Sequence, residues 1–355
     1  MTTTPPIKLG LFMPNCSFSM SMSTYKPHPE EWEFEYNVRI AQLAEAEGFD
    51  FLFPSARWRG MGGETNYQGT NFETFTWAAS MLQRTQRIGV YSTVHVPVYH
   101  PFLVAKMGAG LDYMSGGRWG LNVVSGWNQT EFKMMGLDIA DHARRYERTT
   151  DYIKVIKGLW TCEPGTFDFE SEWYQIHQGW ISPMPHSKPY PPIINAGTSE
   201  AGRNLVATEC DWSFMCPPSV EASGGMVSDI KQRAAKVGRQ VRCVAALFLI
   251  IGDTEAAAEE EKQRILEQAD REALSNWLAG LSMDSNSFDS HTLDMFCLSG
   301  GSTPLVGTPA SIAEAIIEMN RQGMDGVLLS FLDYYAGTQK FAREVIPLLE
   351  KAGIR

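Results

Sequence analysis

The strongest constraint on the fold is a regular alternation of two hydrophobic periodicities along all 355 residues. Short apolar runs rich in β-formers alternate with longer stretches in which apolar residues recur at helical spacing. Since a helix between two strands returns the chain for a parallel pairing, this alternation predicts a parallel sheet. The runs that we expect to be strands are Lys8–Pro14, Phe49–Ser55, Arg87–Val96, Trp119–Ser125, Pro192–Gly197, Trp212–Cys216, Cys243–Gly252 and Gly326–Asp333.

The stretches between these runs carry helix start and stop signals. Apolar side chains share one face of Pro29–Glu47, and Gly48 ends the pattern. His100-Pro101 places a proline at a helix start, and Ala143–Trp160 is amphipathic. Strand–helix units without a Pro/Gly/Ser-rich break favour an α/β fold of the closed (β/α)8 TIM-barrel type over an open doubly wound sheet. We therefore expect one domain over residues 1–355.

Two regions exceed what a minimal barrel needs. Residues 163–191 have the pattern of a hairpin followed by a Pro-rich segment, and residues 254–308 contain the acidic helix "EAAAEEEKQRILEQADREAL" before a Gly/Ser stretch. Long loops of this kind often act as lids. The charges of the acidic helix need no such role, because i, i+4 pairs stabilise a solvated surface helix. We interpret both regions as insertions and as a candidate lid.

Composition excludes several function classes. The net charge of −11, from 41 acidic and 30 basic residues, argues against a general nucleic-acid or anionic-membrane surface. The chain has neither a signal-peptide pattern at its N-terminus nor a run of about eighteen apolar residues, so we expect a cytoplasmic protein without membrane contact. The six cysteines form no C-x-x-C pair and no zinc-finger spacing, which predicts reduced thiols and no metal.

In a barrel of this kind, functional residues gather at the C-terminal ends of the strands. His95 lies where a catalytic base could act, although a histidine at a strand end is more often a hydrogen-bonded structural residue. No carboxylate pair dominates these positions. The candidates at the strand ends are Asn15 and Cys16, Ala56, Arg57 and Arg59, Thr93 and His95, Asn122 to Trp127, Gly197 to Gly202, and Asp333 with Tyr334.

The segment "NAGTSEAGR" joins a strand to a helix that begins near Glu200. Backbone N–H groups at such a start, together with the hydroxyls that follow Gly197 at Thr198 and Ser199, form a natural phosphate site. A plain N-cap is an equal alternative, because Thr and Ser are preferred there without a ligand. The run Arg144-Arg145-Tyr146 supplies charge and a hydroxyl for the same anion, or else forms a surface salt bridge.

Several common motifs are absent from the sequence. The chain has no G-x-x-x-x-G-K-[ST], no G-x-G-x-x-G after a strand, no H-E-x-x-H and no G-x-S-x-G. Nucleotide hydrolysis, Rossmann dinucleotide binding, zinc proteolysis and ordinary serine hydrolysis are therefore disfavoured.

Four segments resemble the bacterial luciferase-like, reduced-flavin-dependent monooxygenases. They are "GFDFLFPSARWRG", "GGRWGLNVVSGWNQTEFKMMG", "HARRYERTTDYIKVIKGLW" and "INAGTSEAG", in the order and at the separations of that family. Within the family the chain is most similar to the group of the pyrimidine, dimethyl-sulfone and dibenzothiophene-sulfone monooxygenases. "RGMGG" and "NFETFT" favour the pyrimidine enzyme, whereas "NCSFSMSMSTYKP" departs from it.

The resemblance implies FMN at the C-terminal mouth of the barrel. Asn122 then bonds a polar edge of the flavin ring, or alternatively satisfies neighbouring backbone, while Ser125-Gly126-Trp127 turns the chain beside the cofactor. Arg145, Tyr146 and Ser199 form the phosphate end. The flavin contacts that the resemblance implies are Ala56, Arg57, Asn122, Glu131, Arg145, Tyr146 and Ser199.

The implied reaction is a two-component monooxygenation. Reduced FMN and O2 give a flavin (hydro)peroxide, held at C4a or at N5, that transfers one oxygen atom to a small pyrimidine or other N-heterocycle, a sulfone or a related compound. Thr93 and Asn122 are candidates for hydrogen-bonding the peroxide. A second nucleotide motif is missing, so we expect reduced FMN to come from a separate NAD(P)H-dependent flavin reductase that binds transiently. Relatives imply a homo-oligomer, a dimer or a tetramer.

Three other functions remain open at this point. A deazaflavin-dependent hydride-transfer enzyme shares this barrel and would act anaerobically. A non-catalytic flavin-binding protein would bind FMN without oxygen transfer. A barrel enzyme for a phosphorylated metabolite would bind a sugar phosphate near Ser199, and no flavin.

Overall fold

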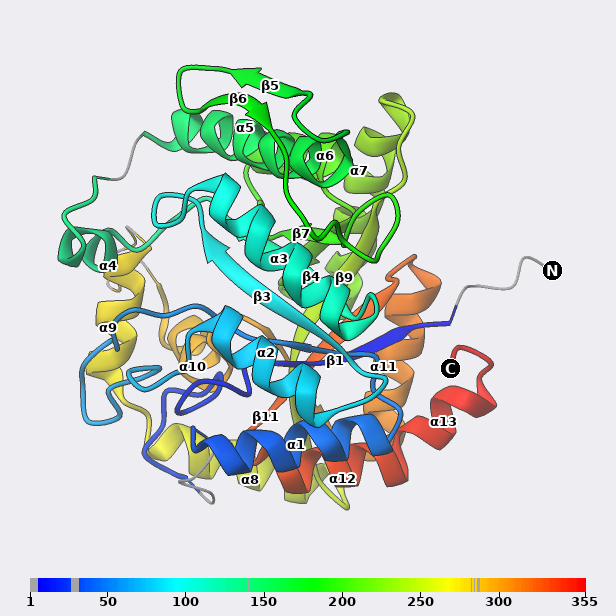
Figure 1. Ribbon diagram of the computed structural model, residues 1–355. Helices are drawn as coiled ribbons and strands as arrows, with labels where there is room; N and C mark the ends of the chain where they lie inside the picture. Colours follow the sequence, from blue (N-terminus) through cyan, green and yellow to red (C-terminus); the bar gives the residue numbers. More distant parts are fainter. Residues whose placement is uncertain (1–5, 27–31, 139–140, 282, 284, 286–287) are drawn as a thin grey trace. The chain divides into compact units, whose positions relative to one another are not determined.

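The computed structural model describes residues 6–26, 32–138, 141–281, 283, 285 and 288–355 (Figure 1). The chain forms two compact units. The first unit comprises Met1–Phe72, Phe214–Asp229 and Arg242–Arg355, and the second comprises Glu73–Ser213 and Ile230–Val241. Helix α7 (Val220–Lys236) runs from the first unit into the second.

The sheet of the first unit is parallel, with strand order β10-β9-β11-β1-β2. Leu9 pairs with Val327 and Leu11 with Leu52. The longest strand carries the apolar run "CVAALFLI", which is buried on both faces as expected for a strand in a parallel sheet. The strands of this unit are β1 (Lys8–Phe12), β2 (Phe51–Phe53), β9 (Arg242–Ile251), β10 (Thr303–Gly307) and β11 (Gly326–Phe331).

The strands of the second unit are also parallel, in the order β3-β4-β7-β8. The register places Thr93 opposite Asn122 and Asn195 opposite Ser213. Strand β8 belongs to this unit through its first two residues, Trp212 and Ser213. The strands are β3 (Gly89–His95), β4 (Trp119–Val124), β7 (Ile193–Asn195) and β8 (Trp212–Met215).

Helices follow the strands in both units. The first unit holds α1 (Phe34–Ala46), α8 (Glu255–Glu267), α9 (Arg271–Gly280), α10 (Ser290–Ser299), α11 (Pro309–Arg321), α12 (Tyr334–Glu344) and α13 (Ile346–Lys351). The second holds α2 (Thr74–Arg84), α3 (Pro101–Ser115), α4 (Gln129–Met134), α5 (His142–Thr161) and α6 (Glu200–Glu209). As predicted, α3 begins with Pro101, and the structure adds that the His100 side chain caps it. The expected helix Pro29–Glu47 begins only at Phe34, and its residues 29–31 lie outside the described residues.

The predicted fold class is confirmed. Each of the eight runs expected to be a strand contains one, the pairings of these strands within each unit are parallel, and helices separate them. The chain is therefore an α/β protein with the (β/α)8 barrel fold. Strand β10 was not predicted: its short run "TPLVG" lies in the insertion and pairs in parallel with β9, Leu305 opposite Leu249.

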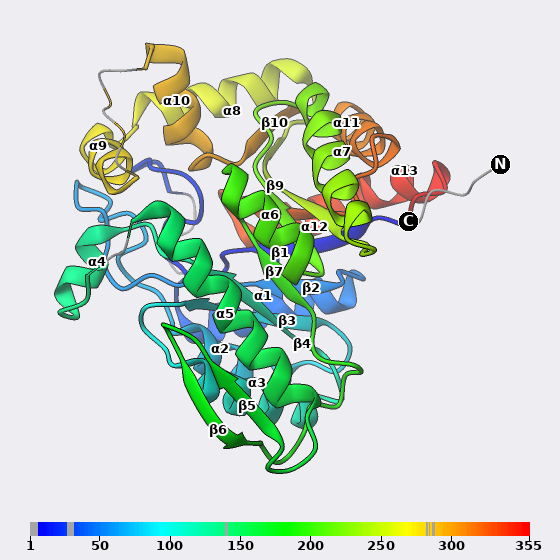
Figure 2. The ribbon, with the colours of Figure 1, turned by 90° about the horizontal axis from the view of Figure 1, so that it is seen from above.

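The two regions expected to be insertions contain the following elements. Residues 163–191 contain the expected hairpin, β5 (Phe167–Glu170) and β6 (Gln175–Gly179), which lies along α5 (Figure 1). The acidic run of the second insertion was expected to be a single helix, and this is wrong: α8 ends at Glu267, and Asp270 caps α9 by accepting a hydrogen bond from Ala273 N–H at 3.0 Å. Helices α8, α9 and α10 gather in one group (Figure 2).

Three further findings concern the described residues. No helix in the described ranges is long and apolar enough to cross a membrane. The six cysteines are free thiols. Over the same ranges, no group of three His, Cys, Asp or Glu side chains could hold a metal ion.

Candidate active site

Strands β3 and β4 carry different sets of side chains on their two faces. On one face, Trp119 Nε1 donates to Ser92 Oγ at 3.0 Å and packs edge-on against Trp160 of α5. Because side chains alternate along a strand, Thr93 and Asn122 lie on the other face, away from the helices. In a barrel this second face points to the interior.

Thr93 and Asn122 form a direct pair on this inner face. Asn122 Nδ2 donates to Thr93 Oγ1 at 3.1 Å, and Thr74 Oγ1 donates to the Thr93 carbonyl at 2.7 Å. Asn122 is 7% exposed, yet its Oδ1 atom has no hydrogen-bond partner among the described residues. A buried acceptor left unpaired costs about 1–3 kcal/mol. The pair therefore fits a ligand that brings a hydrogen-bond donor to Asn122 Oδ1.

The segment after β4 is held by α5. Gly126 has φ +100°, a left-handed conformation that favours glycine at the place where the sequence predicted a turn. Arg145 Nη1 donates to the Gly126 carbonyl, and Thr149 Oγ1 lies 2.9 Å from Ser125 Oγ. One nitrogen of the Arg145 guanidinium thus binds the backbone. A second, Nε, is buried and has no hydrogen-bond partner among the described residues.

The sequence left a surface salt bridge open as the alternative role of the run Arg144-Arg145-Tyr146, and Arg144 forms such a salt bridge. Its guanidinium forms an exposed ion pair with Glu172 and lies 4.7 Å from the centroid of the Trp173 ring. The surface salt bridge therefore belongs to Arg144, and the contact with the strand end belongs to Arg145.

The start of α6 combines a cap with a close approach of two glycines. Ser199 is the N-cap, and its Oγ accepts a hydrogen bond from Gly202 N–H at 3.2 Å. A Cβ atom on Gly202 would lie 2.7 Å from Gly197 Cα and 2.9 Å from Tyr146 Oη. The Tyr146 hydroxyl therefore lies over the helix start, in a space that only glycine leaves open. Thr198 is exposed.

Asn195 was missed by the sequence analysis. It is buried, its Oδ1 accepts the Gly197 N–H at 2.8 Å, and its Nδ2 donates to the Val123 carbonyl. It thereby joins the ends of β4 and β7. The available signal was a polar residue inside the apolar run "PIIN".

His95 and Glu131 lie near the same strand end. The His95 ring is 2% exposed and meets Phe132 edge-on, with 5.6 Å between centroids. Glu131 is fully buried in α4. Phe132 also approaches Gly126, since a Cβ there would lie 3.1 Å from its ring. Candidates from β3, β4 and α4 therefore meet around one aromatic side chain.

Ala56 and Arg57 belong to the first unit. Both follow β2, where Ala56 is buried and Arg57 is half-buried. The preceding turn is fixed by Asn15, whose Nδ2 donates to the Ser55 carbonyl at 2.8 Å and whose Oδ1 accepts the Ser55 N–H at 3.0 Å. Burial raises the pKa of Tyr67 well above its ordinary value, and the positive charge of Arg57 opposes this shift. Arg57 is thus within electrostatic reach of Tyr67.

Comparisons with known proteins show the family to which the chain belongs. Residues 7–326 match the family model of the luciferase-like monooxygenases. The chain belongs to this family. It is 31% identical to an FMNH2-dependent dimethylsulfone monooxygenase of Pseudomonas putida, over 98% of this chain and 96% of the relative. It is 34% identical to the pyrimidine monooxygenase RutA of Enterobacter cloacae, over 97% and 96%.

A solved structure supports the fold. DmoA from Hyphomicrobium sulfonivorans superimposes with a TM-score of 0.87 at 22% identity, over 98% of this chain and 89% of that one. The family resemblance seen in the sequence is therefore confirmed. The predicted enzyme class, a flavin-dependent monooxygenase, and the predicted cofactor, FMN, are those of the family.

Proposed function

We propose that the chain is the oxygenase component of a two-component system, in which it takes reduced FMN from a separate NAD(P)H-dependent flavin reductase and transfers one atom of O2 to a small organic substrate. The observation that carries this proposal is the buried Asn122 Oδ1, which lies beside the Thr93 hydroxyl without a partner in the described residues. Family membership supplies the reaction class.

The start of α6 is proposed to hold the phosphate of FMN. Backbone N–H groups at a helix start favour an anion, and the Tyr146 hydroxyl lies over them. Ser199 can serve as cap and ligand together, because capping uses a lone pair of Oγ and leaves its O–H free to donate. The N-cap and the phosphate site, which the sequence presented as alternatives, are thus compatible.

The Thr93–Asn122 pair is proposed to hold the ring. Asn122 Nδ2 is committed to Thr93, so Oδ1 is the atom that accepts a ring N–H. When bound, reduced FMN supplies the electrons that activate O2. The chain contributes orientation through this pair and excludes water through buried aromatic side chains such as Tyr91, which packs on Gly120. Arg57, Glu131 and Arg145 are proposed as further flavin contacts, and His95 as a catalytic candidate.

The substrate is proposed to be a pyrimidine or other N-heterocycle, a sulfone or a related small compound. Support comes from the two relatives, one named for dimethylsulfone and the other for pyrimidines. Their identities of 31% and 34% are too similar to choose between these classes.

The decisive experiment supplies the purified protein with a flavin reductase, FMN, NADH, ¹⁸O2 and a panel of uracil, sulfones, sulfonates and N-heterocycles. We expect one substrate class to gain a single heavy oxygen by mass spectrometry. Asn122→Ala should weaken FMN binding about tenfold, because a hydrogen bond in a buried site is lost. Product without the isotope, or turnover with NADH alone, would exclude the proposed reaction.

A homo-oligomer is proposed from the outer face of α3. Leu103, Tyr113 and Met114 are 49%, 59% and 66% exposed, although they are large and apolar. Lys106 lies on the same face of α3, and its charged Nζ donates to the Ser182 carbonyl. A Cβ at Gly110 would meet nothing within 4 Å, so a second helix could approach closely. A second copy of this chain would cover the stripe.

Light scattering tests the oligomer directly. We expect a dimer or tetramer, and we expect Leu103→Lys to shift the protein toward the monomer, because a charge would enter the apolar interface. A monomeric wild-type protein would refute this part of the proposal and leave the monooxygenase assignment intact.

A further inference from the structure

The loop after β2 contains a compact body, residues 60–69, which we call the Asn66 loop. It is wound around the Asn66 side chain: a Cβ on Gly60 would lie 2.2 Å from Asn66 Oδ1, and one on Gly69 would lie 2.0 Å from Nδ2. Gly69 N–H donates to the Asn66 carbonyl at 2.7 Å, and Met61 N–H donates to the Tyr67 carbonyl at 3.0 Å. The loop is therefore closed on itself around one side chain.

Asp270, at the start of α9, binds this loop with one carboxylate oxygen. Its Oδ2 accepts the Thr65 N–H at 2.7 Å and the Thr65 hydroxyl at 2.8 Å, while its Oδ1 caps α9. Asp270 is 8% exposed and Thr65 4%. The backbone bends around the carboxylate at Gly63, which has φ +71° and where a Cβ would lie 2.4 Å from Asp270 Oδ1. These are charge-assisted hydrogen bonds in a dry site.

The same residue also ties down the segment that follows β1. Asp270 N–H donates to the Met22 carbonyl at 2.8 Å. In turn, Gln68 of the Asn66 loop donates through Nε2 to the Ser19 carbonyl at 3.3 Å. Ser19 and Gln68 have φ of +45° and +57°, a region that non-glycine residues adopt only when their surroundings enforce it. The two loops and α9 therefore form one interlocked structure.

Arg57 lies between two fixed points of this structure. On one side Ser55 is held by both side-chain atoms of Asn15, and on the other side the Asn66 loop begins at residue 60. We propose that Asp270 is a positioning residue, which fixes Arg57 at the end of β2 by holding the Asn66 loop, and so sets the affinity for the ligand of Arg57. This inference rests on the proposed function where that ligand is taken to be FMN.

Capping alone does not account for these contacts. Asp289 caps α10 in the same insertion by accepting the Thr292 N–H at 2.7 Å, and it is exposed. A cap needs one oxygen, which Asp270 supplies through Oδ1. Its Oδ2 is directed at Thr65. Asp289 is therefore a matched control, because its substitution alters the same kind of cap without touching the Asn66 loop.

The test compares Asp270→Asn with Asp289→Asn in the full chain. If the amide oxygen introduced by Asp270→Asn still caps α9, the amide NH2 faces Thr65: the bond from the Thr65 N–H is lost, the hydroxyl can keep only a bond without charge assistance, and the cap is kept. We expect amide hydrogen exchange in residues 57–69 to accelerate about tenfold and the Kd for FMN to rise by a similar factor in Asp270→Asn only. Exchange is followed by mass spectrometry and FMN binding by fluorescence.

A second pair of variants acts from the other side of the contact. Thr65→Val removes the hydroxyl donor and keeps the N–H, so we expect a smaller change in the same direction, whereas Thr65→Ser should restore wild-type exchange and affinity. If Asp270→Asn fails to fold, these two Thr65 variants still test whether the contact between Asp270 and the Asn66 loop sets the affinity for FMN.

Equal exchange in residues 57–69 for Asp270→Asn and Asp289→Asn would overturn the proposal, as would faster exchange with an unchanged Kd for FMN. A wild-type protein that binds no FMN would refute the proposed function instead. Exchange at Arg57 would then still decide whether Asp270 fixes this residue.

Discussion

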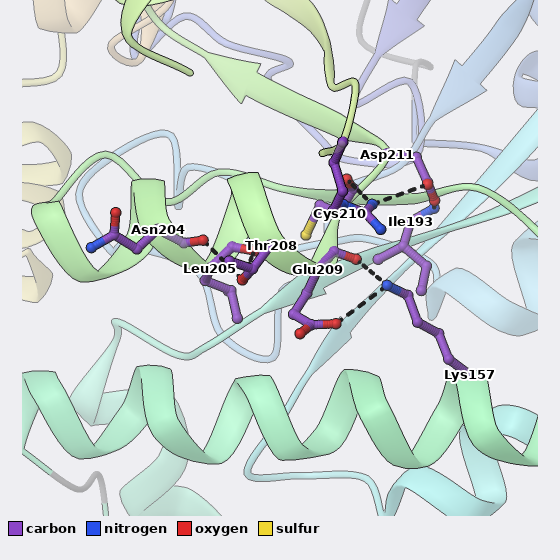
Figure 3. A network of polar contacts seen from close by, with 9 residues as sticks. Lys157, Ile193, Asn204, Leu205, Thr208, Glu209, Cys210 and Asp211 are labelled. Carbon is purple, nitrogen blue, oxygen red and sulfur yellow. Dashed lines mark hydrogen bonds and ion pairs between the residues drawn. The ribbon is translucent and has the colours of Figure 1, made fainter. Parts of the chain in front are cut away.

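Helix α6 meets α5 at both of its ends, and the two ends are built differently. At its C-terminal end, Lys157 Nζ donates to the Glu209 carbonyl at 2.6 Å and pairs with its carboxylate at 3.3 Å (Figure 3). Arg239 Nη2 donates to the Cys210 carbonyl at 2.8 Å, and Asp211 Oδ2 accepts the Ile193 N–H at 2.9 Å. Cations of the chain itself satisfy the helix carbonyls there.

At its N-terminal end, α6 is capped by the Ser199 side chain, and the Tyr146 hydroxyl of α5 lies close to Gly202. Both ends carry the same number of backbone groups that lack helical partners. Under the proposed function, the polar groups at the C-terminal end serve the fold and those at the N-terminal end serve the ligand. This difference predicts that substitutions at the start affect binding, and that substitutions at the end affect stability.

The largest effect is expected from closing the space at the start. Gly202→Ala puts a Cβ 2.7 Å from Gly197 Cα and 2.9 Å from Tyr146 Oη, so backbone and hydroxyl must separate. We expect the affinity for FMN to fall about 100-fold and the free energy of unfolding by about 1–3 kcal/mol. Titration calorimetry and urea denaturation measure these two quantities.

Gly225→Ala in α7 is the matched control. Gly225 is exposed, and a Cβ there meets nothing within 4 Å. The same substitution should therefore stabilise the helix by about 0.5–1 kcal/mol and leave binding unchanged. Equal affinities for FMN in the two alanine variants would remove the distinction between the two ends of α6.

The next largest effect is expected at Ser199, where one substitution can keep the helix cap and disturb the proposed phosphate site. Ser199→Asp keeps an oxygen for the Gly202 N–H and remains a preferred N-cap, so stability should hold. The added negative charge would face the phosphate, and we expect about 100-fold weaker binding of FMN. Riboflavin, which lacks the phosphate, should bind as it does to the wild type. Unchanged affinity for FMN would show that Ser199 is a cap and nothing more.

The start of α6 could be predicted from the sequence better than the residues that surround it. Local signals suffice for a strand end, a helix start and the two hydroxyls beside them, so Gly197, Ser199 and the expected strands were identified from pattern. Whether Ser199 caps or binds could not be decided, because both functions need the same residue type. Tyr146 was named from the run Arg144-Arg145-Tyr146 and again by the resemblance, and in the structure its hydroxyl lies close to Gly202.

What the sequence could not predict depends on contacts far apart in the chain. Asp270 looked like one charge in an acidic helix, because its cap of α9 and its bonds to Thr65 appear only when residues 205 positions apart meet. Strand β10 was missed because "TPLVG" is short and contains proline, and its pairing with β9 decides its conformation.

A smaller effect, on stability alone, is expected at the far end of α6. Lys157→Met keeps most of the side-chain volume and removes both bonds to Glu209, and the Lys157 side chain is only 14% exposed. We expect the free energy of unfolding to fall by about 1–2 kcal/mol, with the affinity for FMN unchanged. Lys154→Met, at an exposed position of the same helix, is the control. Weaker FMN binding without a loss of stability would contradict the division of roles.

The smallest effect is expected at Glu200, in the first turn of α6. Hydrogen bonds from Arg233 and Arg203 lower its pKa from 4.5 to about 2. Because the folded-state pKa is lowered, this carboxylate contributes its stability above pH 4.5 and loses it as the pH falls toward 2. Glu200→Gln should therefore narrow the difference in Tm between pH 7 and pH 4, though only slightly, since the group is exposed to solvent.

The same variant also bears on binding. Glu200 neutralises two arginines beside the start of α6, with Arg233 Nη1 at 2.6 Å and Arg203 Nη2 at 2.9 Å from its oxygens. Removing its charge makes the helix start more positive, so we expect the affinity for FMN to rise about twofold at low salt and the gain to vanish at high salt, where exposed charges are screened. Titrations at two ionic strengths measure this. Weaker FMN binding by Glu200→Gln would mean that Glu200 holds the two arginines in the orientation that binds the phosphate. Ion pairs would then order the start of α6 as they order its C-terminal end.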